Sequence, residues 1–284
     1  MKNTYEIFID NDTYDAERAF YGLKRAAVNN CTFAGPADGE SVLKECREIR
    51  VENCNFSLRY PLWHVEKFDL INSGMDEKTR AALWYCKNGN ISGCNLGGIK
   101  ALRECKSVIL NNCNIVSPEF GWRCKNIKLN GVKAVSEYFM FESKNLVLDG
   151  VDFTGKYSFQ YTKNVKINDC DFTTKDAFWH SKNVTVKNTL LKGEYLGWYS
   201  DGLTLINCTI SGTQPLCYCK NLRLINCRME NCDLSFEYSD VNADIKGNVL
   251  SVKNPKSGKI TADGIGEIIF AENNIPCKGK VFIR

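Results

Sequence analysis

The chain has 284 residues, of which 44% are hydrophobic and 25% are charged, and its net charge at neutral pH is +4. This is the composition of an ordinary globular protein. Because the basic excess is small and no Lys/Arg-rich run is present, we expect no nucleic-acid partner. No apolar stretch approaches the roughly 18 residues that span a bilayer, and residues 1–20 lack the apolar segment of a secretion signal, so we expect no membrane partner.

The dominant feature of the sequence is an internal repeat of about 19 residues. Related segments start at residues 46, 65, 86, 105, 124, 143, 162, 181, 200 and 219, so eight of the nine intervals are 19 residues and the other is 21. A repeat this regular is typical of stacked coils, each of which contacts only the coils before and after it.

Equivalent positions of the repeat form columns, which we number from the first residue of each repeat. Columns 6 and 11 are apolar, and column 5 is mostly polar, which predicts short strands with one face buried. Column 8 predicts a corner, because it contains only residues that tolerate positive φ: Asn53, Asn72, Gly93, Asn112, Gly131, Gly150, Asp169, Asn188, Asn207 and Asn226. The pattern predicts an all-β chain, a single-stranded right-handed parallel β-helix of about twelve coils.

No linker divides the repeats, so a single β-helix domain is predicted for residues 1–284. Within it, residues 1–22 are expected to form an N-terminal cap, residues 23–239 the regular coils, and residues 240–284 irregular final coils, since the register is lost there.

Twelve of the 15 cysteines lie in columns 1 and 9, whose other members are Ser, Thr and Val. Such positions suit a small buried residue, and buried ladders of reduced thiols are therefore predicted. No Cys-x-x-Cys pair occurs and only two histidines are present, so neither a metal site nor a cofactor is expected. Many free thiols indicate a reducing compartment, and we expect the protein to be cytoplasmic.

The third strand of each coil carries the candidate functional residues. Column 17 is apolar and is expected to face inward, whereas column 18 also contains Lys44, Arg103 and Gln160, whose unpaired burial would be costly. Column 18 holds all five tryptophans and column 19 both histidines. If both columns face outward, they form a binding surface with these members: Trp63, His64, Trp84, Tyr85, Trp122, Tyr161, Trp179, Trp198 and Tyr199.

Two alternatives to this surface are open. Column 18 could face inward, which would make the tryptophans part of the core. An outward row could instead be a subunit interface, where Trp and Tyr are also enriched.

Catalytic candidates come from the same columns. Glu104 and Glu142 are two coils apart in column 19, so their carboxylates would be roughly 9 to 10 Å apart, near the upper range of an inverting glycosidase pair. Arg123 lies between them, and the alternative is a ladder of alternating charges. His180 could be a general base or a surface histidine packed between rings, and Asp176 would be roughly 13 Å from it along the strand, too far for a direct dyad.

Several segments carry a family resemblance. NVTVKN (183–188) and CKNLRLINC (219–227) resemble the pectate-lyase-like β-helix superfamily. The chain is similar over nearly its whole length to one uncharacterised bacterial domain-of-unknown-function family with this fold, in these segments: YPLW (60–63), KDAFWHSKNVTV (175–186), GEYLGWYS (193–200), QPLCYCKNL (214–222) and FEYSDV (236–241). The resemblance implies the fold and carbohydrate chemistry but no catalytic residues, because the basic residue and calcium-binding aspartates of pectate lyases have no counterpart here.

Two functions remain as expectations. The first is binding, and with it processing, of an oligo- or polysaccharide along columns 18 and 19. The second is a non-catalytic scaffold or homo-oligomer that uses the same face for protein contact.

Overall fold

The computed structural model describes residues 5–35, 39–272 and 275–284, and these fold into strands and turns. Among these residues, no helix is long and apolar enough to cross a membrane. The chain divides into two compact units, residues 1–144 (unit 1) and residues 145–284 (unit 2). The expectation of a single domain over 1–284 stays a prediction, and each unit is considered by itself below.

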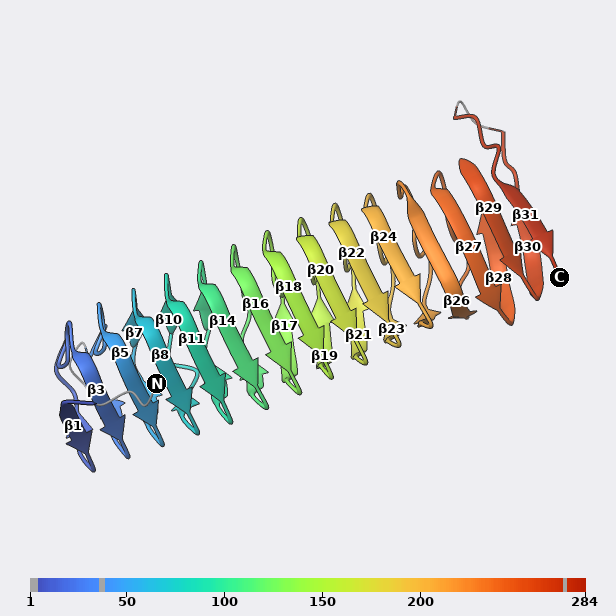
Figure 1. Ribbon diagram of the computed structural model, residues 1–284. Coiled ribbons are helices and arrows are strands. Elements are labelled where there is room, and N and C mark those ends of the chain that lie inside the picture. The colour runs from blue at the N-terminus through green and yellow to red at the C-terminus, as the bar shows by residue number, and fades with distance from the viewer. Residues whose placement is uncertain (1–4, 36–38, 273–274) are drawn as a thin grey trace. The chain divides into compact units, whose positions relative to one another are not determined.

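Unit 1 is built from parallel strands that return to the same side once per coil (Figure 1). Its principal sheet contains β1 (Ile7–Asp10), β3 (Lys24–Asn29), β5 (Arg47–Glu52), β8 (Glu66–Ile71), β11 (Lys87–Ser92), β14 (Lys106–Asn111) and β16 (Lys125–Asn130). The second side contains β2 (Thr13–Tyr14), β4 (Thr32–Ala34), β6 (Asn55–Ser57), β9 (Gly74–Met75), β12 (Asn95–Gly97), β15 (Asn114–Val116) and β17 (Lys133–Glu137). The third side contains the short strands β7 (Leu62–Trp63), β10 (Leu83–Trp84) and β13 (Leu102–Arg103).

Unit 2 repeats this arrangement. Its principal sheet contains β18 (Lys144–Asp149), which begins at the unit boundary, and β20 (Lys163–Asn168), β22 (Lys182–Lys187), β24 (Asp201–Ile206), β26 (Leu222–Glu230), β27 (Asp240–Lys246), β29 (Ser257–Ala262) and β31 (Lys280–Ile283). Its other strands are β19 (Asp152–Lys156), β21 (Asp171–Lys175), β23 (Leu190–Lys192), β25 (Thr209–Ser211), β28 (Asn248–Lys253) and β30 (Gly264–Ile269).

The strand register confirms the predicted parallel β-helix in each unit. Val108 of β14 pairs with Gly89 of β11 and with Ile127 of β16, each 19 residues away. Leu205 of β24 pairs with Val186 and Leu224 at the same interval. In a single-stranded solenoid each strand pairs with the equivalent strands of the preceding and the following coil, so paired residues are one repeat apart in the sequence.

The corner at column 8 is confirmed by its backbone geometry. Asn188, Asn207 and Asn226 have φ between 49° and 52°, the left-handed region that Asn tolerates better than most residues. Their side chains form a ladder, in which Asn226 Nδ2 donates to Asn207 Oδ1 at 2.8 Å and Asn207 Nδ2 donates to Asn188 Oδ1 at 3.2 Å. The corner residues therefore stabilise the stacking of the coils and also turn the chain.

The core consists of apolar ladders from the inner columns. Leu62, Leu83 and Leu102 of column 17 are fully buried in unit 1. In unit 2, the ring of Phe159 stacks on Phe172 and Phe178 at centroid distances of 5.6 and 5.1 Å, and all three rings are buried. The inward direction expected for column 17 is therefore what both units have.

The segments on either side of the predicted regular coils also pair with the sheet. Residues 7–10, inside the predicted cap, form β1 and pair with β3, while residues 1–4 of that prediction lie outside the described residues. In the last coils the pairing interval changes from 17 residues between β27 and β29 (Asp240 with Ser257) to 21 between β29 and β31 (Lys259 with Lys280).

Fourteen cysteines are buried, Cys277 is partly exposed, and all 15 are free thiols. Their Sγ atoms donate weak hydrogen bonds to backbone carbonyls, as from Cys105 to Leu83 at 3.2 Å. Burial raises the pKa of the Cys46 and Cys232 thiols to about 12 and that of Cys54 to about 11. The thiols of the ladders therefore behave as small core residues.

We expect Cys277 alone to react with a thiol reagent in the native protein at pH 8, because the reagent has to reach the sulfur and the other fourteen thiols are buried. Absorbance titration with a disulfide reagent should count one thiol in the native chain and 15 in denaturant. Cys277→Ser should abolish the native signal. Several fast-reacting thiols in native Cys277→Ser would contradict the buried ladders.

Candidate functional site

The third side of each unit turns two neighbouring columns outward. In unit 2, Asp176 (column 15), Phe178 (column 17) and His180 (column 19) all have φ between 54° and 62°. Left-handed residues interrupt the alternation of a strand, in which every second side chain points inward. Trp179 and His180 can therefore both lie on the outer side, while Phe178 between Asp176 and His180 stays buried.

In unit 1, column 18 is a stack of cations and indole rings. Lys44 Nζ lies 4.1 Å from the ring centre of Trp63, which stacks on Trp84 at 5.3 Å with an angle of 9°. Arg103 Cζ follows at 5.3 Å from Trp84 and 6.0 Å from Trp122. Cation–π contacts of this kind are attractive because the ring face is electron-rich. The tryptophans are half-buried on the outer side, so they are not core residues, but their ring faces are covered by the stack.

The third side changes its hydrogen-bond direction within unit 1. The N–H of Leu83 donates forward to Ala101 O of the next coil at 2.9 Å, as in an ordinary strand. The N–H of Gly121, whose φ is +79°, instead donates backward to Leu102 O at 2.8 Å. A left-handed residue at column 17 thus reverses the peptide group that precedes it.

The indole N–H groups differ between the two parts of this side in whether they have a hydrogen-bond partner. Trp122 follows the reversed peptide at Gly121, and its Nε1 atom donates to the Tyr138 carbonyl of the next coil at 2.9 Å. Trp63 and Trp84, which lie in the extended part, have buried Nε1 atoms without a hydrogen-bond partner among the described residues. A buried donor without a partner costs free energy. The contacts that hold these two tryptophans are therefore ring stacking and cation–π contacts, and their indole N–H groups contribute no hydrogen bond.

Column 19 of unit 1 forms a chain of polar contacts beside the tryptophans. His64 Nδ1 lies 3.5 Å from Glu45 Oε1, and the His64 and Tyr85 rings meet edge to face at 5.0 Å. Glu104 contacts Arg103 Nε at 3.2 Å, and its hydrogen bond to the Tyr85 hydroxyl raises the pKa of that phenol. The sequence-predicted residues His64, Tyr85 and Glu104 are therefore neighbours within unit 1.

The remaining catalytic candidates of unit 1 are engaged with each other. Arg123 Nε donates to Glu142 Oε2 at 2.7 Å, and both side chains are about half exposed. With Glu104 held by Arg103 and Glu142 by Arg123, each carboxylate of the predicted pair has a cationic partner. This arrangement fits the alternating-charge ladder, and a catalytic role of Glu104, Arg123 and Glu142 stays a prediction.

Unit 2 carries a continuous row of five stacked rings, the tyrosine–histidine row: Tyr161, His180, Tyr199, Tyr218 and Tyr238. The first three contacts have centroid distances of 4.8 to 5.0 Å and angles of 13° or less. The last contact is wider, 5.7 Å with a tilt of 42°. All five residues have φ between 54° and 59°, so the same left-handed turn presents each ring.

Trp179 and Trp198 pack behind this row. Their rings stack at 5.4 Å with an angle of 6°, and their Nε1 atoms donate to the carbonyls of Tyr195 (2.7 Å) and Gln214 (2.8 Å). Trp198 also meets the ring of Tyr218 edge to face at 5.3 Å. The two tryptophans therefore support the row, with their ring faces in use.

The structure separates the two predicted catalytic residues of unit 2. Asp176 is 6% exposed, and burial raises the pKa of its carboxyl group. Its backbone carbonyl accepts a hydrogen bond from Gln160 Nε2 at 3.1 Å. His180 is exposed and lies between the rings of Tyr161 and Tyr199, the packed arrangement that was one of its two alternatives. A general-base role for His180 stays a prediction.

A depression of about 530 Å³ adjoins the end of the row. Burial, with a smaller effect of Glu237, raises the pKa of the Tyr218 phenol, so its hydroxyl stays protonated at neutral pH and can donate a hydrogen bond. No carboxylate among the described residues forms an ion pair with Lys220 or Lys256. The lining residues are Tyr199, Tyr218, Cys219, Lys220, Asn221, Tyr238, Asp240, Lys256, Ser257 and Ile275.

The rings of the row present their edges to solvent, because neighbouring rings cover their faces. The exposed edges carry phenolic hydroxyls and an imidazole, at an interval of about one coil, roughly 4.8 Å. Such edges donate and accept hydrogen bonds. Tyr218 and Tyr238, whose rings are tilted by 42° to each other, both line the depression.

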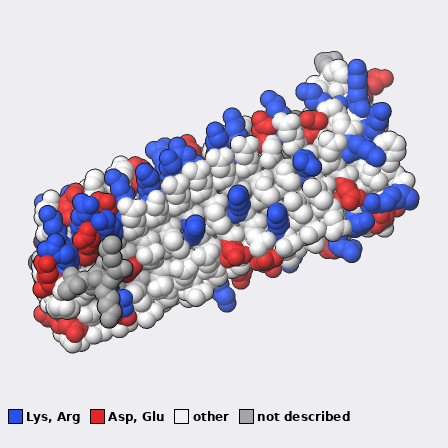
Figure 2. Space-filling model, viewed as in Figure 1, with Lys and Arg blue, Asp and Glu red and all other residues white. Residues whose placement is uncertain are grey.

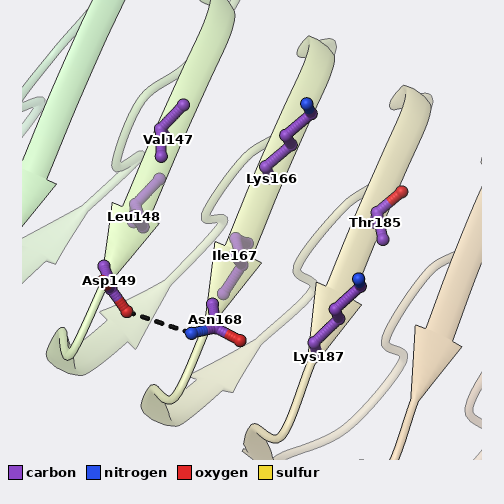
Figure 3. A pocket seen from close by; sticks show the side chains of 8 residues that line it. All are labelled: Val147, Leu148, Asp149, Lys166, Ile167, Asn168, Thr185 and Lys187. Atoms are coloured by element: carbon purple, nitrogen blue, oxygen red, sulfur yellow. Dashed lines mark hydrogen bonds between the residues drawn. The ribbon is translucent and has the colours of Figure 1, made fainter.

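A second depression, about 510 Å³, lies on the outer face of β18, β20 and β22. Figure 3 shows Lys166 and Lys187 projecting outward while Leu148 and Ile167 point behind the sheet, and Asn168 Nδ2 donates to Asp149 Oδ1 at 3.1 Å. Its lining lacks aromatic rings and combines two lysines with Asp149. We therefore regard the ring-lined depression as the better candidate site.

Sequence reasoning placed Tyr161, Trp179, His180, Trp198 and Tyr199 on one surface, and these five lie together in unit 2. It missed Tyr238 and the polar residues Lys220, Asn221, Lys256 and Ser257 of the depression. The interval of 20 residues from Tyr218 to Tyr238 is close to the repeat and is the signal that could have extended the row. Lys256 and Ser257 belong to the coils where the repeat register is lost, so the columns gave no signal for them, and Lys220 and Asn221 lie in columns 2 and 3 of the last regular repeat, which were not assigned to the surface.

A family comparison matches nearly the whole chain. The profile of a family described as "Protein of unknown function (DUF3737)" covers residues 7–282. A search among curated proteins finds no significant match.

Comparison with solved structures finds distant similarities. PfbA, a surface adhesin of Streptococcus pneumoniae, has 10% identity and a TM-score of 0.37, with 87% of this chain and 74% of that chain covered. A point mutant of the periplasmic alginate epimerase AlgG has 8% identity and a TM-score of 0.33 (91% and 76% covered). The A-module of the Azotobacter vinelandii mannuronan C-5 epimerase AlgE4 has 9% identity and a TM-score of 0.28 (92% and 87% covered). Similarities at this level carry no argument about the site, which rests on its own geometry.

Proposed function

The chain belongs to the DUF3737 family, so its function has to be inferred from its own side chains, and we propose that the tyrosine–histidine row of unit 2 and the adjoining depression bind an extended oligo- or polysaccharide. The observation that supports this proposal most directly is the row of five ring edges ending at a depression lined by hydrogen-bonding groups.

A saccharide chain matches the row in chemistry and in form. Its hydroxyl groups recur along an extended polymer, and the row offers a phenol or imidazole edge at each coil. Each hydrogen bond is worth only about 0.5–1.5 kcal/mol net, so affinity requires several in line. The depression adds two lysines, an amide and a hydroxyl, and the tilted ring of Tyr238 provides an apolar surface for a sugar ring.

Asp240 and Asn221 in the depression are already held in place. Ser257 Oγ donates to Asp240 Oδ1 at 2.9 Å, and Asn221 Nδ2 donates to Asp201 Oδ1 at 2.8 Å. Side chains fixed by such contacts lose little further entropy when a ligand binds. Binding is the proposed activity, and we assign no reaction to this surface. The free thiols support placing the protein in a reducing compartment, as part of this proposal.

The test removes the hydroxyls and keeps the rings. We expect Tyr199→Phe/Tyr218→Phe to weaken binding to the oligosaccharide selected by wild type from an immobilised panel of neutral and acidic glycans. Loss of two hydrogen bonds should reduce the affinity about tenfold, as measured by isothermal titration calorimetry. The stacked rings remain, so the melting temperature should be unchanged.

Tyr21→Phe is the matched control, because Tyr21 is 56% exposed and belongs to unit 1, whereas the row belongs to unit 2. It should bind as wild type does. The saccharide proposal is wrong if wild type retains no glycan of the panel. Concentration-dependent dimers that dissociate in Tyr199→Phe/Tyr218→Phe, measured by sedimentation, would instead favour the homo-oligomer.

A further inference from the structure

The outer face of the principal sheet in unit 2 carries a line of cations that the saccharide proposal does not use. Arg223 of β26 pairs with Asn242 of β27, Asn242 with Lys259 of β29, and Lys259 with Lys280 of β31. All four side chains are exposed, and we call them the cationic column. On the face shown in Figure 2, Lys and Arg side chains gather over β27, β29 and β31.

A depression of about 520 Å³ lies along this column. Asn242 forms its centre, between Arg223 on one neighbouring strand and Lys259 on the other. The lining residues are Arg223, Leu224, Ile225, Asn242, Ala243, Asp244, Lys259, Thr261 and Arg284.

Two carboxylates near the depression form ion pairs with Arg284. Its Nη1 atom contacts Asp244 Oδ1 at 2.7 Å, and its Nε atom donates to Asp263 Oδ1 at 2.8 Å. The Gly247 N–H also donates to Asp263 at 2.6 Å, and this hydrogen bond, with Arg284, lowers the pKa of the Asp263 carboxyl. The Asp263 carboxyl therefore stays ionised at neutral pH, and both acids are paired with Arg284.

The cations of the column itself have no such partner. Within the described residues, no carboxylate forms an ion pair with Arg223, Lys259 or Lys280. Lys259 Nζ lies 5.0 Å from the ring centre of Phe282, a cation–π contact that positions the ammonium without cancelling its charge. The depression therefore has a local positive charge.

The spacing of these groups suits a single oxyanion. Neighbouring strands are about 4.8 Å apart, so Arg223 and Lys259 flank Asn242 from roughly 4.8 Å on each side. An anion over Asn242 would receive hydrogen bonds from the guanidinium fork, the ammonium and the amide NH₂. A tetrahedral anion can accept all three from different directions, and charge-assisted hydrogen bonds of this kind are the strong ones.

We propose that the depression over Asn242 is a binding site for a phosphate or sulfate group, held by Arg223, Asn242 and Lys259. This site is independent of the tyrosine–histidine row and of the saccharide proposal. Phosphate and sulfate esters share the tetrahedral oxyanion that the site recognises, and the two free anions are the probes that separate them.

The experiment is isothermal titration calorimetry of the full chain with inorganic phosphate, inorganic sulfate and acetate, at one ionic strength set with chloride. Wild type should bind phosphate or sulfate at least about tenfold more tightly than planar, singly charged acetate. The tighter of the two tetrahedral anions identifies the ester class. Raising the chloride concentration should weaken binding, because the cations are exposed.

Arg223→Gln and Lys259→Gln should each weaken binding of the preferred anion, Arg223→Gln by about tenfold because a bidentate contact is lost. Arg228→Gln on β26 and Lys192→Gln on β23 are matched controls, since both are exposed cations of unit 2 outside the depression. They should stay within about twofold of wild type.

Three results would overturn the proposal. Wild type could bind neither tetrahedral anion, acetate could bind as tightly as phosphate and sulfate, or the control variants could weaken binding as much as Arg223→Gln. The last result would mean that net charge alone attracts the anion. Because glycan binding is measured separately with the tyrosine variants, each of these outcomes leaves the saccharide proposal to its own test.

Discussion

Phe172→Ala is expected to lower the free energy of unfolding by about 3–5 kcal/mol, the cost of removing a buried aromatic ring from a packed core. Phe172 is fully buried and contacts two other core rings, Phe159 at 5.6 Å and Phe153 at 5.8 Å. The cavity would open in the core of unit 2, beside the rings of Phe153 and Phe159. Chemical denaturation followed by circular dichroism measures the change.

Phe270→Ala is the matched control, because Phe270 belongs to the same unit but is 53% exposed. Its expected cost is below about 0.5 kcal/mol. Because a solenoid can unfold coil by coil, a second probe such as tryptophan fluorescence should be followed in parallel. Equal effects of the two substitutions would show that the Phe172 ring is not in a tight core.

Gly193→Ala is expected to be strongly destabilising, costing on the order of 3 kcal/mol. Gly193 has φ +142°, and a Cβ there would lie 1.6 Å from the Thr174 carbonyl oxygen of the preceding coil. The neighbouring atom is backbone, so the coils would have to separate. The hydrogen bond from Gly193 N–H to Ser211 O at 2.8 Å would be disturbed with them. Thermal unfolding by calorimetry gives the expected loss.

Gly247→Ala separates the steric effect from the dihedral effect. Gly247 also has positive φ (+80°), but the nearest atom to its added Cβ is Arg228 Nη1 at 4.0 Å. Only the left-handed conformation is then penalised, at about 1–2 kcal/mol. If Gly247→Ala were as destabilising as Gly193→Ala, the close approach of the Thr174 and Gly193 backbones would not be what requires glycine.

The candidate site was predictable as a set of positions but not as a surface. The period placed Trp179, His180 and Tyr199 in line, because every coil repeats the same columns. The orientation of these side chains depends on left-handed φ at large residues such as His180 and Tyr199, which seldom adopt it. That conformation is imposed by hydrogen bonds from one coil to the next, as from His180 N–H to Trp198 O at 3.0 Å. No local sequence pattern reports such an effect.

The chemistry of the surface also differs from what the columns suggested. The tryptophans were expected to be part of the binding surface, but the rings of Trp179 and Trp198 cover each other's faces, as those of Trp63 and Trp84 do. A column shows which side chains recur from coil to coil. Because neighbouring coils are only about 5 Å apart, rings in the same column stack on one another. In the proposed site we therefore expect recognition by ring edges, through hydrogen bonds, rather than by apolar ring faces.

The sequence by itself determined the repeat, the parallel β-helix, the buried cysteine ladders and the Asn/Gly corner, because these depend on burial and on backbone preferences that each residue type carries alone. Only the tertiary structure decided that Glu142 is held by Arg123, that Asp176 is buried away from His180, and that Arg223 and Lys259 flank Asn242. These facts depend on which residues the coils bring side by side and on how each side chain is paired. Such pairings are made between residues about one coil apart in the chain, across strands that become neighbours only when the coils stack.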